Sequence, residues 1–201
     1  MSKKMDSQEI NLMQELMQFL FEVGHLKNVD RSGWWLFGNK KPESVAEHSF
    51  RCAILGYFLA KSEGLDAFKV MMMCLFHDIH EARINDLHKV AQNYINLEDA
   101  ESKASQEQLK PLNDPEKTEI GNTLQEFLDQ KSKESIVAKD ADILECAMQA
   151  REYQVQGYEA AIDWLERAKS TLKSESAKRL LSTIALSDPN EWWKKLKAKS
   201  K

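Results

Sequence analysis

The sequence predicts an all-α protein, a compact helical bundle that forms a single domain over residues 1–201. Apolar residues recur every three or four positions through most of the chain, which is the period of an amphipathic helix. Only 7 glycines and 4 prolines interrupt this pattern, and no useful stretch alternates as a half-buried strand does. A chain of this length can bury a core without disulfides, so we expect Cys52, Cys74 and Cys146 to be reduced thiols among apolar residues.

Three helices are predicted in the N-terminal half, over residues 8–24, 43–64 and 66–84. The first is amphipathic, and its apolar stripe consists of Ile10, Met13, Leu16, Met17, Leu20 and Val23. The second starts behind Pro42 and stops at Gly64. The third has Asp66 as its N-cap and is apolar nearly all round, which indicates a central helix surrounded by the others.

In the C-terminal half, the sequence pattern predicts a turn with a short helix, then four longer helices, and finally a short capped helix with a basic tail. The expected ranges are 85–95, 113–131, 133–157, 158–172, 174–186 and 188–201. Asn113 or Asp114 caps the second of these, with Pro115 at its first position. No repeat or linker divides the chain, which favours one domain.

Composition and charge exclude several classes of function. The formal net charge of -4 offers no broad positive field, so we expect no binding to a nucleic-acid polymer. The longest apolar run, residues 70–76, is far shorter than the roughly 18 residues of a membrane span. The first residues do not resemble a secretory signal, and we therefore expect a cytoplasmic protein without a membrane partner.

The most apolar run of the chain leads directly into His77 and Asp78. An ionised Asp78 at the end of a dry helix is costly unless a cation or a hydrogen-bond donor meets it. A divalent metal ion would meet that demand, and His77 offers a neutral nitrogen ligand beside it. The pair therefore predicts half of a metal site.

Other helices supply candidates for the other half. His48 lies on the edge of the apolar stripe of the second helix, and Asp140 and Asp142 lie early in the helix over residues 133–157. A single such histidine is most often a core residue, and Asp142 alone can be a solvent-facing carboxylate. All the positions together favour the metal site, with Asp140 and Asp142 as competing candidates for the fourth ligand.

These residues resemble the HD-domain superfamily of metal-dependent phosphohydrolases. The segments "RSGWW" at 31–35, "PESVAEHSFR" at 42–51, "HDIHEARINDL" at 77–87 and "AKDADILECA" at 138–147 are similar, in order and spacing, to the 5′-deoxynucleotidase group. The resemblance covers about residues 12–155, and residues 158–201 would add helices packed on that core. It implies an all-α HD-type fold and, in solution, a homodimer.

The resemblance implies that His48, His77, Asp78 and Asp142 hold one divalent ion. Two imidazoles and two carboxylates suit Mn²⁺, Co²⁺, Fe²⁺, Ni²⁺ or Zn²⁺ better than Mg²⁺.

The resemblance also implies roles for residues around the ion. Glu81, expected one helical turn beyond His77, would take the proton of the water that attacks phosphorus. Asp86 would hold that water or relay the proton, and Arg31 would grip the 5′-phosphate. Trp34 or its neighbour Trp35 would pack on the sugar or base, or belong to the core or a dimer contact.

Three positions depart from the family pattern. Asn85 replaces the glycine before Asp86, His88 replaces a small residue or proline, and His80 replaces a small or acidic residue. These changes affect the rim of the pocket and hence the choice of substrate. They also leave open a second ion, bound through His80 or His88.

We therefore expect a phosphohydrolase that converts (deoxy)nucleoside 5′-monophosphates into nucleoside and phosphate. An alternative keeps the metal but acts on a nucleoside triphosphate, a pyrophosphate or a cyclic nucleotide. A third interpretation is a helical binding protein whose ion is structural, although such an ion has no need of Glu81, Asp86 or Arg31.

Overall fold

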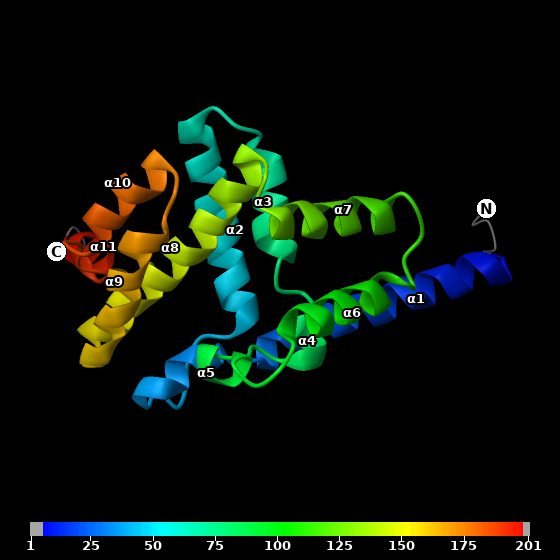
Figure 1. The fold of residues 1–201 in the computed structure, drawn as a ribbon, viewed down its shortest axis with the longest axis horizontal. Coiled ribbons are helices and arrows are strands. Elements are labelled where there is room, and N and C mark those ends of the chain that lie inside the picture. Colours follow the sequence, from blue (N-terminus) through cyan, green and yellow to red (C-terminus); the bar gives the residue numbers. More distant parts are fainter. Residues whose placement is uncertain (1–5, 199–201) are drawn as a thin grey trace. The chain divides into compact units, whose positions relative to one another are not determined.

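The computed structural model describes residues 6–198, and within them the chain is built of helices without a strand (Figure 1). A single isolated bridge pairs Asp30 with Ser44. The α-helices are α1 (Ser7–Gly24), α2 (Val45–Glu63), α3 (Ala67–Phe76), α4 (Glu81–Ile84), α5 (Lys89–Gln92), α6 (Leu97–Leu109), α7 (Glu116–Asp129), α8 (Lys133–Val155), α9 (Ile162–Thr171), α10 (Glu175–Ile184) and α11 (Glu191–Ala198). The short 3₁₀ helices are η1 (His25–Asn28), η2 (Ser32–Phe37) and η3 (Glu159–Ala161). The all-α prediction is confirmed, and none of the described helices is long and apolar enough to cross a membrane.

The chain divides into two compact units, each made of two separate stretches. The first unit contains Met1–Phe50 and Leu75–Lys131, and the second contains Arg51–Cys74 and Ser132–Lys201. The divisions fall inside α2 and α3, so each of these helices contributes residues to both units. The single domain expected from the sequence stays a prediction.

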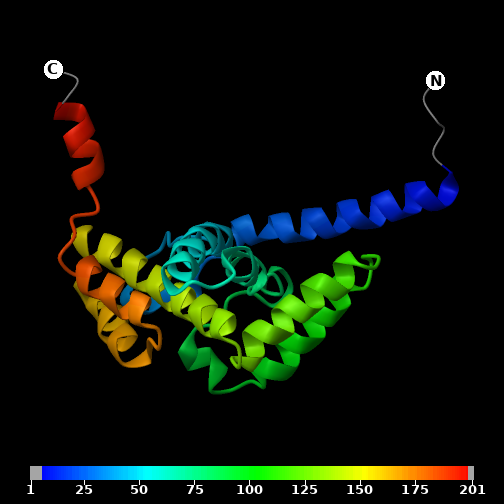
Figure 2. The same cartoon turned by 90° about the horizontal axis from the view of Figure 1, so that it is seen from above.

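The first unit has its own apolar core, and α6 and α7 lie side by side within it (Figure 2). Its buried members are Phe19, Leu26, Val29, Val45, Ile79, Leu109, Leu112 and Leu124. Sequence periodicity did not predict α6, because this helix is polar along most of its length and buries only Ala104, Gln108 and Leu109. Its start is nevertheless capped, since the Asn96 side chain accepts a hydrogen bond from the backbone N–H of Asp99.

Helix α1 forms as predicted, capped by Asp6, but of its apolar stripe only Val23 packs against the core. Ile10, Met13, Leu16, Met17 and Leu20 are all exposed, and Phe19 is the one buried residue among those of the helix. A stripe of this size on one helix is unusual for a surface that meets only water.

The third predicted helix is shorter than expected and only partly central. Helix α3 ends at Phe76, eight residues before the predicted end at Ile84. Val70, Met73 and Cys74 are buried, whereas Phe68 is 66% exposed. An apolar composition therefore did not guarantee burial on every side of this helix.

The second unit is organised around α8, against which α9 and α10 pack. Helix α8 matches the predicted range and buries a series of small residues, among them Ala138, Ala141, Ala147 and Ala150. Small side chains allow close approach of neighbouring helices. Cys52 and Cys74 are reduced, buried thiols here as predicted, and Cys74 Sγ lies 3.7 Å from the carbonyl oxygen of Ala138, while Cys146 is partly exposed.

Gly56 marks a close approach of helices in the second unit. A β-carbon added there would lie 2.6 Å from the Cys74 sulfur, 3.2 Å from Val70 Cγ1 and 3.6 Å from Ala141 Cβ. The absence of a side chain at Gly56 thus lets α2 approach both α3 and α8.

We expect Gly56→Ala to lower the free energy of unfolding by about 1–3 kcal/mol, because the added methyl overpacks this contact. The measurement is urea denaturation followed by circular dichroism. Gly24→Ala is the matched control: Gly24 has helical dihedral angles and nothing within 4 Å of the added carbon, so this variant should be equally stable or gain up to about 1 kcal/mol. Equal stabilities of the two variants would contradict the close packing at Gly56.

Candidate metal centre

His77 and Asp78 lie in a turn rather than on a continuous helix. Between α3 and α4, the backbone N–H of Ile79 donates to the carbonyl of Phe76, and that of Glu81 donates to the carbonyl of Asp78. The predicted helix over residues 66–84 is therefore wrong for residues 77–80. The helical spacing used to place Glu81 beside His77 does not apply, although the turn keeps Glu81 close to Asp78.

His48 is placed by a capping box at the start of α2. Ser44 Oγ accepts a hydrogen bond from the backbone N–H of Glu47, and the Glu47 carboxylate accepts one from the backbone N–H of Ser44. These reciprocal bonds begin the helix immediately before His48, which is fully buried.

His48, His77 and Asp78 converge within the first unit. Asp78 Oδ2 lies 3.0 Å from His77 Nε2 and 3.8 Å from His48 Nε2, and the two imidazole centroids are 5.4 Å apart. One ligand atom from each residue lies within 4.8 Å of the others. Two nitrogens and a carboxylate oxygen in this arrangement fit a divalent transition metal ion.

Asp142 and Asp140 belong to α8 in the second unit and have different surroundings. Asp142 is mostly buried, and its Oδ2 is 2.6 Å from Lys139 Nζ. The carboxylate of Asp140 accepts hydrogen bonds from the backbone N–H groups of Lys173 and Ser174, before α10. Asp140 thus has a structural role, which favours Asp142 as the ligand, and that assignment stays a prediction.

Arg31 is held over the first unit's carboxylates. Its Nη1 donates to Asp78 Oδ2 at 3.1 Å, and its Nε lies 3.9 Å from Asp86 Oδ2. Asp86 also accepts a hydrogen bond of 2.9 Å from the backbone N–H of Ser32. Because Asp86 contacts both Arg31 and its neighbour in sequence, it fixes the arginine loop against the metal site.

The pKa values of two carboxyl groups of the site, those of Glu81 and Asp86, are both raised. Burial raises the pKa of Glu81 well above its ordinary range, and the charges of Asp78 and Asp86 raise it further. Burial also raises the pKa of Asp86, although Arg31 opposes this shift. Glu81 is 8% exposed, and its Oε2 accepts no hydrogen bond from the described residues. The first unit therefore gathers three carboxyl groups, those of Asp78, Glu81 and Asp86, around the single guanidinium of Arg31, and a bound cation would favour their ionised forms.

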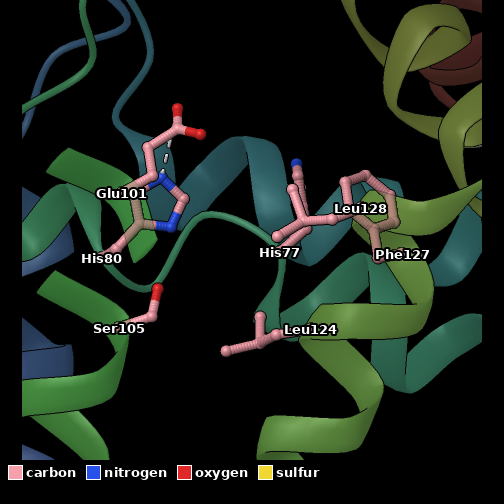
Figure 3. A pocket seen from close by; sticks show the side chains of 7 residues that line it. All are labelled: His77, His80, Glu101, Ser105, Leu124, Phe127 and Leu128. Atoms are coloured by element: carbon pink, nitrogen blue, oxygen red, sulfur yellow. Dashed lines mark ion pairs between the residues drawn. The ribbon is translucent and has the colours of Figure 1, made fainter. Parts of the chain in front are cut away.

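His80 lines a neighbouring pocket. Figure 3 shows His80 facing Glu101 of α6, with 3.6 Å between Nε2 and Oε1, while His77 lies beside Phe127 of α7. The pocket also has Ser105 in its wall and a volume of about 20 Å³, enough for one water molecule. Sequence reasoning did not find Glu101 or Ser105, because they lie on the helix that periodicity failed to predict.

The other two departures from the family pattern have local structural roles. Asn85 ends α4 with a φ of 62° and a ψ of 165°, a backbone conformation that is adopted almost only by glycine. His88 caps α5, since its Nδ1 accepts the backbone N–H of Ala91 at 3.2 Å. Of the two histidines considered for a second ion, His80 lies with Asp78 and Glu81 in a group whose ligand atoms are within 4.8 Å of one another. A second ion stays an open prediction.

Trp34 is almost completely buried. Its indole N–H donates to Glu43 Oε1 at 3.0 Å, and its ring lies 5.8 Å from that of Phe37. Trp35, in contrast, is 50% exposed. This arrangement favours a structural role for Trp34, and its contact with substrate stays a prediction. Of the two neighbouring tryptophans, Trp35 is the one that a ligand could reach.

Together, the fold and the site define an all-helical protein with a centre of histidine and aspartate suited to a divalent metal. The chain belongs to the HD domain family, whose model matches residues 23–184. The match continues beyond residue 155, where the sequence resemblance was expected to fade, and includes α9 and α10.

Named relatives and solved structures agree with this assignment. A 5′-deoxynucleotidase HDDC2 of Dictyostelium discoideum is 32% identical over 157 residues, covering 73% of this chain and 82% of the relative. The human 5′-deoxynucleotidase HDDC2 is 31% identical over 141 residues, covering 69% and 68%. A conserved hypothetical protein from Pyrococcus furiosus has a similar structure, with a TM-score of 0.71 and 30% identity over 85% of this chain and 99% of its own.

Proposed function

We propose that this protein is a metal-dependent phosphohydrolase that converts nucleoside 5′-monophosphates, with deoxy forms preferred, into nucleoside and phosphate. The observation that carries the proposal is the convergence of His48, His77 and Asp78 in a buried site beside Arg31 and Glu81. The names of the 5′-deoxynucleotidase relatives supply the substrate class.

In this proposal one divalent ion is held by His48, His77, Asp78 and Asp142. The nitrogen and oxygen donors suit Mn²⁺, Co²⁺, Fe²⁺, Ni²⁺ or Zn²⁺. When bound, such an ion polarises a phosphate oxygen and makes water a better nucleophile. It also supplies the positive charge that the buried carboxylates of this site need.

The remaining groups handle the proton and the phosphate. Glu81 takes the proton from the attacking water, because its carboxylate lies next to Asp78 and keeps an oxygen without a hydrogen-bond donor. Arg31 binds the phosphate and offsets the charge that grows on its oxygens. Asp86 holds the Arg31 loop through Ser32 and can assist with the proton. A phosphate would compete with Asp78 and Asp86 for the guanidinium of Arg31.

The exposed stripe on α1 supports a homodimer. A second copy of the chain would cover Ile10, Met13, Leu16, Met17 and Leu20, which are otherwise left in water. Light scattering on the pure protein measures the assembly directly, and a monomeric mass at micromolar concentration would contradict it. The cytoplasmic location expected from the sequence stays a prediction.

A panel of nucleotides with phosphate detection tests the proposed function. The protein is stripped of metal, reloaded with Mn²⁺ or Co²⁺, and supplied with deoxy- and ribonucleoside 5′-monophosphates, triphosphates and cyclic nucleotides. We expect inorganic phosphate from the deoxynucleoside monophosphates first. Release from only the triphosphates or cyclic forms would favour the alternative substrate class, and release from none would favour a binding protein with a structural ion.

A further inference from the structure

Arg51 of α2 binds three side chains of α8 within the second unit. Its Nε donates to Glu145 Oε1 at 2.8 Å, its Nη2 to Gln149 Oε1 at 2.7 Å, and its Nη1 to Glu152 Oε1 at 2.7 Å. All three nitrogens of the guanidinium therefore have an acceptor on the same helix. We name this set of four residues the Arg51 clamp.

The clamp differs from an ordinary surface ion pair because its anchor is buried. Glu145 is fully inaccessible to solvent, and Gln149 is 8% exposed. A buried carboxylate is stable only with a close, well-aligned partner, whereas exposed pairs contribute little. The acceptors lie on successive turns of α8, so the planar guanidinium sets the position of α2 along α8 as well as its distance.

The clamp lies one helical turn from two of the proposed metal ligands. Helix α2 runs without interruption from Val45 to Glu63, and Arg51 follows His48 by three residues. On α8, Glu145 follows Asp142 by three residues. Residues three apart share a face of a helix, so the turns joined by the clamp are continuous with the turns that carry the two ligands.

A second contact between α2 and α8 lies at Gly56. Gly56, farther along α2, lies where an added β-carbon would be 3.6 Å from Ala141 Cβ on α8. Because α2 contacts α8 closely at both Arg51 and Gly56, it has little freedom to slide or rotate against α8.

We infer that Arg51 is a positioning residue: by fixing α2 against α8 it presets the ligand pair His48 and Asp142 for the ion. This inference rests on the proposed function, in which both residues hold the same metal. Arg51 itself contacts neither the ion nor the substrate, because its donors are used by Glu145, Gln149 and Glu152. Its effect is therefore on metal affinity and coordination geometry.

The test compares Arg51→Lys with the double variant Arg51→Met/Glu145→Met. Lysine keeps the charge but cannot reach three acceptors in fixed geometry, and the double variant removes the charge pair without leaving a buried carboxylate alone. Metal affinity is measured by calorimetric titration of the stripped protein with Co²⁺, and coordination geometry by the visible absorption of the Co²⁺-loaded protein. We expect both variants to bind Co²⁺ about 10- to 100-fold more weakly, with an altered spectrum.

Arg151→Lys is the matched control. Arg151 is also an arginine of the second unit, and it joins α8 to the segment after α10 by donating to the carbonyl of Ser187 at 3.1 Å. The control should bind Co²⁺ as the parent does, whatever its melting temperature. Unchanged affinity and spectrum in the Arg51 variants, or the same loss in the control, would overturn the inference. A parent protein that binds no Co²⁺ would instead overturn the proposed function.

Discussion

Replacing Asp78 with alanine is expected to abolish both metal binding and phosphatase activity. Asp78 Oδ2 lies close to both imidazoles, 3.0 Å from His77 Nε2 and 3.8 Å from His48 Nε2. Without it, the first unit keeps only the two imidazoles as ligands, and the local negative charge that attracts a cation falls. Plasma mass spectrometry of the dialysed protein should find metal near zero, and phosphate release should fall to the background rate.

Variants of two aspartates on α8, Asp142 and Asp140, are the comparison for this experiment. Asp142→Asn should also lose the ion, whereas Asp140→Asn should retain it, because Asp140 accepts backbone N–H groups before α10. Asp140→Asn is expected to cost about 1.5–3 kcal/mol of stability, the scale of a hydrogen bond to a charged group. A normal metal content in Asp78→Ala would show that Asp78 is not a ligand.

Replacing Glu81 with glutamine is expected to lower kcat by at least about 10²-fold while the ion is retained. Glutamine has nearly the same shape but cannot accept the proton of the attacking water. Glu81 is buried next to Asp78, and its Oε2 accepts no hydrogen bond from the described residues, so the carboxylate is available for this role. The measurements are steady-state phosphate release and metal content of the same preparation.

Glu101→Gln is the matched control for Glu81. Glu101 is a partly exposed carboxylate whose Oε1 lies 3.6 Å from His80 Nε2, and it has no role in the proposed reaction. We expect it to keep kcat within a few-fold of the parent. Loss of the ion from Glu81→Gln would mean that Glu81 is a metal ligand, and unaltered kcat with full metal would exclude it as the base.

Much of the helical architecture could be predicted because it depends on local patterns. The range of α8 follows from apolar spacing, and α2 was expected to start behind Pro42, close to where the structure begins it with the capping box of Ser44 and Glu47. Helix α6 escaped prediction because its buried face includes Gln108, whose amide donates to the carbonyl of Ile79. A buried polar residue with a distant partner leaves no apolar signal in the sequence.

The segment "VMMMCLFHDIHEA" at 70–82 shows most clearly what the sequence could and could not predict. Its composition indicated that His77 and Asp78 follow an apolar run within one helix and predicted that they bind a metal ion. The sequence could not show that the helix ends at Phe76, because the end depends on backbone hydrogen bonds in the turn.

By itself, the sequence determined the helical class, the family resemblance and the residue types of the metal centre, since all of these reside in local composition and spacing. Only the tertiary structure decided what each polar group contacts: Trp34 donates to Glu43, Asp86 holds the Arg31 loop, and His80 faces Glu101. Such partners lie far apart along the chain or on unpredicted helices. Their meeting depends on how the backbone folds in three dimensions, and no local pattern encodes it.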